Sequence, residues 1–459
     1  MKKLSIILFI VLLLAAAAGG LPYWFGMQAE SAYEAMIAEM TANGDITVTN
    51  KNFQRGWLES TADTTFTITG TPVTVTSLDR IQHGPLPLDE PLELTPVLAR
   101  VKSQMSIGLP GGVLKLPPIS GRTTFYLAGN SQSRIEMAGA KTATADGAAI
   151  EWKGLTGTID TSADFKSSKG ELSGPALIIT AKDGVTSFNR ITIGFDQQKS
   201  PSGFDIGTAN FGVDKLVIDS AKLNAGIDGL RVASTTQEAG GNLNSTLNFN
   251  FREVRAGADK QGPGQMTVQV RKLDVATLVK FRKQMRDLKK QNMPPEQANM
   301  MMLGKTLELL GELAKKAPEV EITKMSFKTA DGEVTGKAKF VLDGSQLDVA
   351  GNPMLMLKAL SGEGEVKLPD SLIAMLAGSD VRRDLDNLKA SGKLTEAEIA
   401  KLTPKRVAMI TQQAIKELPQ YKDSVVSRLK LVPDGPNYKI VASLKSGQLL
   451  VNDQPLQMQ

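Results

Sequence analysis

The chain opens with a hydrophobic pattern typical of a membrane segment. Two lysines precede an apolar run from Leu4 to Gly20, and uncharged residues continue as far as Met27. A helix of this length crosses about 30 Å of hydrocarbon when it is tilted. The last part of the segment carries aromatic residues of the kind that lie at membrane interfaces, namely Tyr23, Trp24 and Phe25. The pattern therefore predicts a membrane anchor over residues 1–27.

A cleaved secretory signal is the alternative for the same segment. It would cover residues 4–18, with Ala16 and Ala18 at the small-residue positions of a cleavage site. In the anchored form, the two lysines keep the short end in the cytoplasm by the positive-inside rule. We therefore expect a single-pass protein of a bacterial inner membrane with its body in the periplasm, a compartment in which nucleic acid is not expected as a partner.

The pattern changes twice in the next part of the chain. Residues 28–42 place apolar side chains at helical spacing, at Tyr33, Met36, Ile37 and Met40, which predicts an amphipathic helix. From there to about residue 270, short runs rich in Thr, Val, Ile and Phe are separated by Gly, Asn, Asp and Pro, as in strands and turns. The runs lack a fixed repeat length, so we expect a long antiparallel meander, with a curved open sheet as one form of it.

Helical periodicity returns near residue 271. Asp274 is placed to cap a first helix, two prolines at 294 and 295 break it, and a second helix runs from about 296 to 316. Beyond this helical hairpin, Asp331-Gly332 predicts a turn between two antiparallel strands. Further helices are predicted near 369–377 and 395–418, and closing strands over 438–451.

These patterns together predict a β-rich α+β protein with four regions. They are a membrane anchor over 1–27, a β-rich region with a short amphipathic helix over 28–270, a basic, Met-rich helical hairpin over 271–318, and an α+β region over 319–459.

The amino-acid composition excludes several kinds of catalytic and metal site. The 459 residues include no cysteine and one histidine, His83, so thiol nucleophiles, thiolate metal sites and His clusters are excluded. Gly84 and Pro85 place His83 in a turn, where its ring most simply bonds a backbone group. Carboxylates such as Glu59 and Asp89 show no spacing typical of an acid–base pair. We predict no catalytic residue, no metal and no cofactor.

The hairpin carries the strongest local charge. Residues 271–291 hold eight bases and two acids, an excess of six, whereas the whole chain has a net charge of +5. A basic amphipathic helix attracts anionic headgroups, and methionines form adaptable apolar walls. Candidate headgroup contacts are Lys280, Arg282, Lys283 and Arg286. Candidate groove residues are Met285, Met300, Met301, Leu303 and Leu307. The ordinary alternative is a solvated helix face above a packed core.

Three short motifs point to a family. Phe53 to Ser60 contains Arg55-Gly56-Trp57, residues 83–86 read His83-Gly84-Pro85-Leu86, and residues 447–452 read Gly-Gln-Leu-Leu-Val-Asn. In this order the motifs resemble the YdgA-like family of bacterial envelope proteins, domain of unknown function 945. The resemblance implies an inner-membrane anchor, a periplasmic body and self-association into a homo-oligomer. It supplies no catalytic residues.

Two functional hypotheses follow. In the first, a noncatalytic envelope protein holds or passes a lipid or other amphiphile along a concave sheet, or supports envelope maintenance. In the second, a structural or assembly factor docks a protein partner or a second copy. The first predicts an apolar concavity and the second an apolar surface patch.

Overall fold

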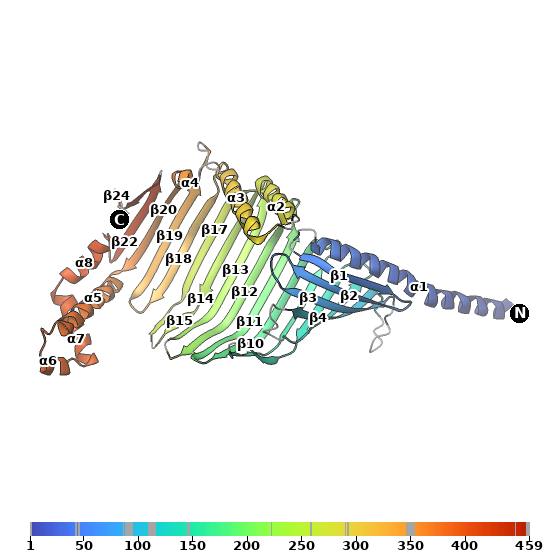
Figure 1. The fold of residues 1–459 in the computed structure, drawn as a ribbon, viewed down its shortest axis with the longest axis horizontal. Coiled ribbons are helices and arrows are strands. Elements are labelled where there is room, and N and C mark those ends of the chain that lie inside the picture. The colour runs from blue at the N-terminus through green and yellow to red at the C-terminus, as the bar shows by residue number, and fades with distance from the viewer. Residues whose placement is uncertain are drawn as a thin grey trace. The chain divides into compact units, whose positions relative to one another are not determined.

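The chain folds into helices and long antiparallel strands (Figure 1). It divides into two compact units. The computed structural model describes residues 2–41, 44, 46–85, 87, 95–108, 116–144, 147–221, 223–257, 259–289, 291, 293–345, 354–445 and 447–455. Unit 1 comprises Met1–Glu238 and Val279–Lys305, and unit 2 comprises Ala239–Leu278 and Thr306–Gln459. Asp89, one of the carboxylates considered above, lies outside the described residues.

Unit 1 contains α1 (Lys2–Thr41) and an antiparallel sheet in which most neighbours in sequence pair with each other. The strands are β1 (Ile46–Arg55), β2 (Glu59–Ile68), β3 (Thr74–His83), β4 (Val97–Gly108), β5 (Ile119–Tyr126), β6 (Ser131–Met137), β9 (Leu155–Thr161), β10 (Ser167–Ala181), β11 (Gly184–Lys199), β12 (Asp205–Ser220) and β13 (Asn224–Ala239). The hairpin of β7 (Ala140–Ala143) and β8 (Ala149–Trp152) pairs with the second half of β10.

Unit 2 contains further antiparallel strands of the sheet and a group of helices. The sheet strands are β14 (Asn242–Phe251), β17 (Gly264–Asp274), β18 (Glu319–Thr329), β19 (Gly332–Leu342), β20 (Leu360–Pro369), β22 (Asn437–Lys445), β23 (Gln448–Val451) and β24 (Gln454–Pro455). Short strands β15 (Glu253–Ala256), β16 (Asp259–Gln261) and β21 (Val432–Asp434) complete it. The helices are α4 (Met354–Ala359), α5 (Asp370–Ala390), α6 (Glu396–Ala400), α7 (Pro404–Glu417) and α8 (Gln420–Arg428). Ile373, Ala377 and Val425 are fully buried at the centre of this helical group.

The predicted fold class is confirmed, including several local signals. Asp274 caps α2 (Val275–Lys289) by accepting a hydrogen bond from the Thr277 N–H at 2.8 Å, and α3 (Pro295–Ala314) follows the two prolines. Strands β18 and β19 close at the predicted turn, with Thr329 opposite Gly332. The strands β10 to β13 are longer than predicted, at 15 or 16 residues each. Their polar and glycine-rich stretches read as turns, but cross-strand pairing carries the strands through them.

Helix α1 combines the predicted membrane anchor, residues 1–27, with the predicted amphipathic helix, residues 28–42. Residues 2–41 form one helix, with Pro22 inside it. Phe25, Ala29, Tyr33 and Ile37 are spaced four residues apart and are buried, because this stripe faces the sheet of unit 1. Phe25 was expected at a membrane interface and instead lies in the protein interior. Of the residues that the structure describes, no helix combines the length and apolar character needed to cross a membrane.

Candidate functional site

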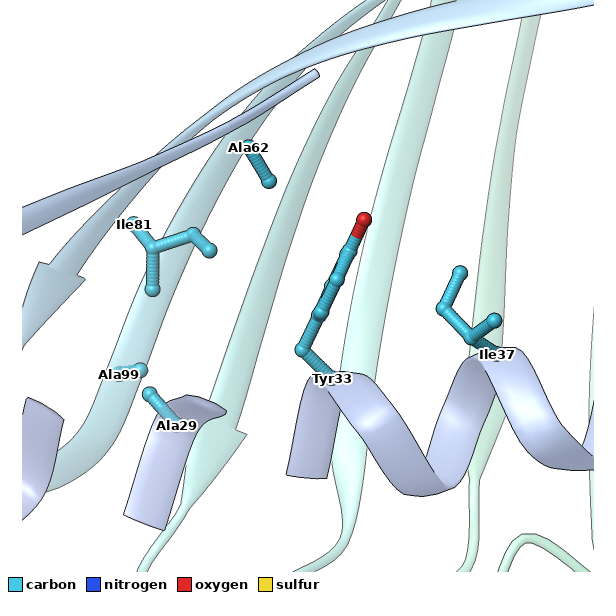
Figure 2. Close-up of a cluster of buried hydrophobic side chains, with 6 residues drawn as sticks. All are labelled: Ala29, Tyr33, Ile37, Ala62, Ile81 and Ala99. Atoms are coloured by element: carbon cyan, nitrogen blue, oxygen red, sulfur yellow. The ribbon is translucent and has the colours of Figure 1, made fainter. Parts of the chain in front are cut away.

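The face of α1 that meets the sheet of unit 1 is the centre of the candidate site. Figure 2 shows Ala29, Tyr33 and Ile37 pointing from α1 toward Ala62, Ile81 and Ala99 of the strands. These six residues form one buried cluster, with Ala62 on β2, Ile81 on β3 and Ala99 on β4. The sheet presents its apolar face here because alternate residues of each strand point to the same side.

His83 lies directly beneath α1. Its Nδ1 donates to the Trp57 carbonyl oxygen at 3.1 Å, since a carbonyl only accepts, and its Nε2 accepts from the Ser60 hydroxyl at 2.8 Å. A Cβ at Gly26 would lie 2.5 Å from the ring, so only glycine allows α1 to approach this closely. Burial lowers the pKa of His83 and outweighs the carbonyls of Trp57 and Pro22, which favour the protonated ring.

The Ser60 hydroxyl and the His83 ring are in hydrogen-bond contact, as a nucleophile and its general base would be. Two features of their surroundings argue against that role. Ser60 is 0% exposed and His83 is 3% exposed, so no substrate reaches the hydroxyl while α1 is docked. The ring nitrogen opposite Ser60 bonds a backbone carbonyl and not a carboxylate. The sequence predicted a backbone partner for this ring. The structure adds that the ring is a docking surface for α1.

Arg55 and Trp57 hold the outer side of the same helix. The guanidinium of Arg55 donates to the Glu30 carboxylate at 2.8 Å and to the Tyr23 hydroxyl at 3.3 Å, and it lies 5.1 Å from the centre of the Tyr23 ring. Tyr23 in turn packs against Trp57, with ring centroids 5.4 Å apart. Two motif residues separated from α1 in sequence therefore bind it directly.

The glycines of the two motifs allow close backbone contacts. A Cβ at Gly56 would lie 2.3 Å from the Glu59 carbonyl oxygen, and one at Gly84 would lie 1.9 Å from that of Val97. Gly84 donates its N–H to Leu98 at 2.9 Å, and Pro85 accepts from Val97 at 2.9 Å. Residues Arg55, Gly56, Trp57, His83, Gly84 and Pro85, far apart in sequence, thus form one structural cluster. We call it the α1 clamp.

An apolar cavity of about 340 Å³ lies beside the buried cluster, between α1 and the strands. Its helix wall carries Tyr33, Met36 and Met40, and its sheet wall is mainly apolar, with small hydroxyl residues from β3 to β6. Cavities that bind small molecules hold about 300–1,000 Å³ and are mostly apolar with a few polar groups. The dimensions and lining of this cavity fit that description.

Asp79 is the charged group in the sheet wall of the cavity. Burial raises its pKa, partly opposed by hydrogen bonds from Ser103 and Ser77, and the Ser77 hydroxyl donates to Oδ1 at 2.8 Å. The folded protein therefore holds the Asp79 proton at pH values where the unfolded chain has released it. Stability is lost as pH rises from the unfolded pKa of about 3.9 through the higher folded value.

We expect Asp79→Asn to raise the free energy of unfolding at pH 8, on the order of 1 kcal/mol, because the amide keeps the acceptor for Ser77 without the buried charge. Urea unfolding between pH 3 and 8 measures this, and the gain should vanish below pH 4. Asp183→Asn, at an exposed turn residue, is the matched control. A variant less stable than the wild type at pH 8 would contradict this reading of Asp79.

The candidate residues of the hairpin are not among the described residues that line this cavity. Met300 is 76% exposed and Leu303 is 62% exposed, while Met285 and Leu307 are half-buried and Met301 is exposed. Lys280 and Lys283 are exposed and Arg286 is half-buried. Arg282 makes intramolecular contacts: its guanidinium donates to the carbonyls of Gly203 and Ser202 at 2.8 and 2.9 Å and lies over the Phe204 ring.

Sequence reasoning found the helix wall of the cavity but not the cavity. The stripe of Tyr33, Met36 and Met40 was visible as a helical period, and the alternation along 58–68 was visible as a strand. Asp79, Ser103 and Gly121 gave no signal, because only strand pairing places them side by side.

The fold and the site define a β-rich protein whose N-terminal helix is held against an antiparallel sheet, with the His83 ring beneath Gly26 and close backbone contacts at Gly56 and Gly84. A family model described as "Bacterial protein of unknown function (DUF945)" matches residues 1–459, and the chain belongs to this family. No curated protein and no solved structure matches the chain.

Proposed function

We propose that this protein is a noncatalytic, membrane-tethered periplasmic protein of the bacterial envelope that holds an amphiphile, with the apolar part of the ligand in the cavity under α1. The observation that carries the proposal is this cavity of about 340 Å³, walled by Met36 and Met40 on one side and by the sheet on the other. Methionine side chains adapt to ligands of variable shape, as an acyl chain requires.

The tether is proposed from the sequence that precedes the clamped part of α1. Lys2 and Lys3 are followed by the apolar run to Gly20, and the clamp acts on α1 from Pro22 onward. Such an arrangement would hold the cavity close to the source of an amphiphile. Fractionation with a high-salt wash, followed by N-terminal sequencing, tests it. Recovery of the full-length native protein in the soluble fraction would contradict the tether.

Filling the cavity should displace the ligand. Gly121 faces the cavity from β5, and a Cβ there would meet Ser103 at 3.5 Å and Met105 at 3.8 Å, which is ordinary contact. Gly121→Leu should therefore fold while its side chain occupies the cavity. We expect lipid that co-purifies in mild detergent to fall about tenfold, equivalent to about 1.4 kcal/mol, as measured by mass spectrometry of extracts.

Ser120→Leu is the control for this experiment, because the same side chain is added one residue earlier and points to the opposite face of the sheet. Equal lipid content in both variants and the wild type would show that the cavity does not hold the ligand. A wild type that carries no lipid would remove the proposal.

A structural or assembly role through self-association is the second candidate. It is favoured by the exposed apolar side chains Met300 and Leu303 on α3. Light scattering of the full chain in detergent distinguishes it: Met300→Gln with Leu303→Gln should lower the oligomer mass if this face joins two copies.

A further inference from the structure

One side of the unit 1 sheet remains apolar across strands β9 to β13. Residues directly opposite each other on paired strands point to the same side, so the strand registers show which side chains share it. We call the following set the apolar sheet face. Its members are Leu155, Gly157 and Ile159 of β9, Gly170, Leu172 and Gly174 of β10, Ile191, Ile193 and Phe195 of β11, Ala209, Phe211 and Val213 of β12, and Leu230, Val232 and Ser234 of β13. None of them is charged, and Ser234 alone has a polar side chain.

The cavity under α1 lies on this same side of the sheet. Gly121 of β5 lines the cavity and lies opposite Ile135 of β6, which lines it as well. Ile135 in turn lies opposite Gly157, a member of the apolar sheet face. Ile159 belongs both to the cavity lining and to the apolar sheet face. The two apolar surfaces therefore meet at β9 and form one continuous surface.

The apolar sheet face is partly open, whereas the opposite side of the same strands is polar. Antiparallel sheets commonly leave a polar face in solvent and bury the apolar one. Here Ile193 and Phe211 of the apolar sheet face are 41% and 39% exposed. Exposed apolar patches of this kind mark binding surfaces. The residues that alternate with the apolar sheet face include Thr156, Thr158, Glu171, Ser173, Thr192, Asn210 and Arg231.

Glycines keep the apolar sheet face low beside the cavity. A Cβ at Gly170 would lie 2.5 Å from the Phe195 ring, and one at Gly157 would lie 2.6 Å from the Leu172 side chain. The Phe195 and Leu172 side chains therefore lie over the glycines of the neighbouring strands. Glycine within a strand allows a ligand to approach the backbone closely. A flexible hydrocarbon chain can follow such a surface, because no side chain projects from these positions.

The chemistry of the apolar sheet face fits a hydrocarbon chain better than a protein partner. A protein interface carries about one hydrogen bond per 100–200 Å². Among the side chains of the face, only that of Ser234 can form one. The backbone groups of β10 to β12 are paired with strands on both sides, so these strands offer no free edge to a partner.

The width of the apolar sheet face also matches an acyl chain. Neighbouring strands lie about 4.8 Å apart, so the distance from β9 to β13 is about 19 Å. The hydrocarbon core of a bilayer is about 30 Å thick, so the acyl chains of one leaflet extend about 15 Å. One acyl chain therefore fits across the face.

We propose that the apolar sheet face holds one acyl chain of a membrane lipid while the second acyl chain of the same lipid occupies the cavity under α1. This inference rests on the proposed function and specifies its ligand as a diacyl lipid, because the cavity and the face are two apolar surfaces that meet at β9. The chain on the face crosses the strands from Ile159 toward Phe211 and covers the exposed side chain of Ile193.

Photocrosslinking of the full chain, reconstituted in vesicles of dioleoylphosphatidylglycerol, tests the proposal. Phe211→benzoylphenylalanine places a photoreactive ring on the apolar sheet face. Asn210→benzoylphenylalanine is the matched control, because Asn210 is exposed on the opposite side. We expect at least tenfold more phospholipid adduct at position 211 than at position 210, measured by mass spectrometry of the intact protein. Adding Gly121→Leu, which fills the cavity, should lower the adduct at position 211 at least threefold.

Three results would overturn the inference: equal adduct at positions 210 and 211, no phospholipid adduct at position 211, or a covalent dimer there in its place. Ile193→benzoylphenylalanine, with Thr192→benzoylphenylalanine as its control, repeats the comparison on β11. Matching circular dichroism spectra establish that the variants are folded.

The same proteins separate this inference from the proposed function. If co-purifying lipid falls in Gly121→Leu but position 211 gives no phospholipid adduct, the cavity holds the ligand and the inference is wrong. If Gly121→Leu changes neither the co-purifying lipid nor the adduct at position 211, the proposed function is wrong, and the shared site with it.

Discussion

Gly26→Ala is expected to detach α1 from the sheet of unit 1. The added Cβ would lie 2.5 Å from Cε1 and 2.8 Å from Nδ1 of His83, distances that atoms in contact do not adopt. The ring is unable to move aside, because it is buried and bonded to Ser60 and Trp57. Overpacking of this kind costs about 1–3 kcal/mol. Hydrogen exchange over residues 28–41 and limited proteolysis of the full chain in detergent measure the detachment.

Gly20→Ala on the same helix is the matched control. Nothing lies within 4 Å of a Cβ at Gly20, so alanine there should leave α1 docked and gain up to about 1 kcal/mol of helix propensity. Both substitutions increase helix propensity, so a loss of stability seen only for Gly26→Ala comes from its contact with the sheet. Because α1 forms one wall of the cavity, Gly26→Ala should also release the co-purifying lipid.

A double-mutant cycle assigns the effect to His83. His83→Ala removes the ring that the new Cβ would strike, although it also removes the hydrogen bonds to Ser60 and Trp57. We therefore expect Gly26→Ala to cost less in the His83→Ala background than in the wild type, with a coupling of at least about 1 kcal/mol. Additive effects, or a Gly26→Ala protein with wild-type protection of α1, would refute this account of the clamp.

Glu319→Gln is expected to destabilise unit 2 and to remove part of its sensitivity to acid. Glu319, at the start of β18, is 8% exposed and accepts from Lys272 and from Arg271, the latter at 3.1 Å, with Lys339 at 3.5 Å. The hydrogen bond from Lys272, more than any other contact, lowers the pKa of Glu319 to about 2. The three cations are partly exposed, so solvent screening limits the loss at pH 7 to about 2 kcal/mol.

The pH dependence has a definite direction. A carboxylate with a lowered folded pKa contributes its stability above the unfolded pKa, near 4.5, and loses it as pH falls toward about 2. Between pH 5 and 2 the wild type should therefore lose most of the stability that Glu319→Gln lacks, and the two curves should meet only below the folded pKa of about 2. Glu333→Gln, at an exposed residue of β19, serves as the control in urea unfolding. Parallel curves for Glu319→Gln and the wild type would exclude Glu319 as a source of acid sensitivity.

The sequence predicted those features that a single segment decides. The alternation along 58–68 corresponds to β2, the Asp331-Gly332 pair corresponds to the β18–β19 turn, and Asp274 caps α2 as its position indicated. Each feature depends on residues only a few positions apart, so the local pattern contains the information. The short helix α8 was not predicted, because Pro419 and the polar residues around it resemble a loop.

Features that depend on distant residues emerged only from the tertiary structure. The apolar positions Tyr33 and Ile37 of α1 were readable from their helical spacing, but their partners were not, since Ala62, Ile81 and Ala99 come from three strands. Likewise the apolar residues at 172, 193, 211 and 232 are unremarkable along the chain and become one row through three strand registers. Local patterning thus determined which segments are helices and strands, whereas strand register decided which side chains meet. Register is set by the pairing of whole strands, and a shift of one residue would turn a strand's apolar side chains to the opposite face.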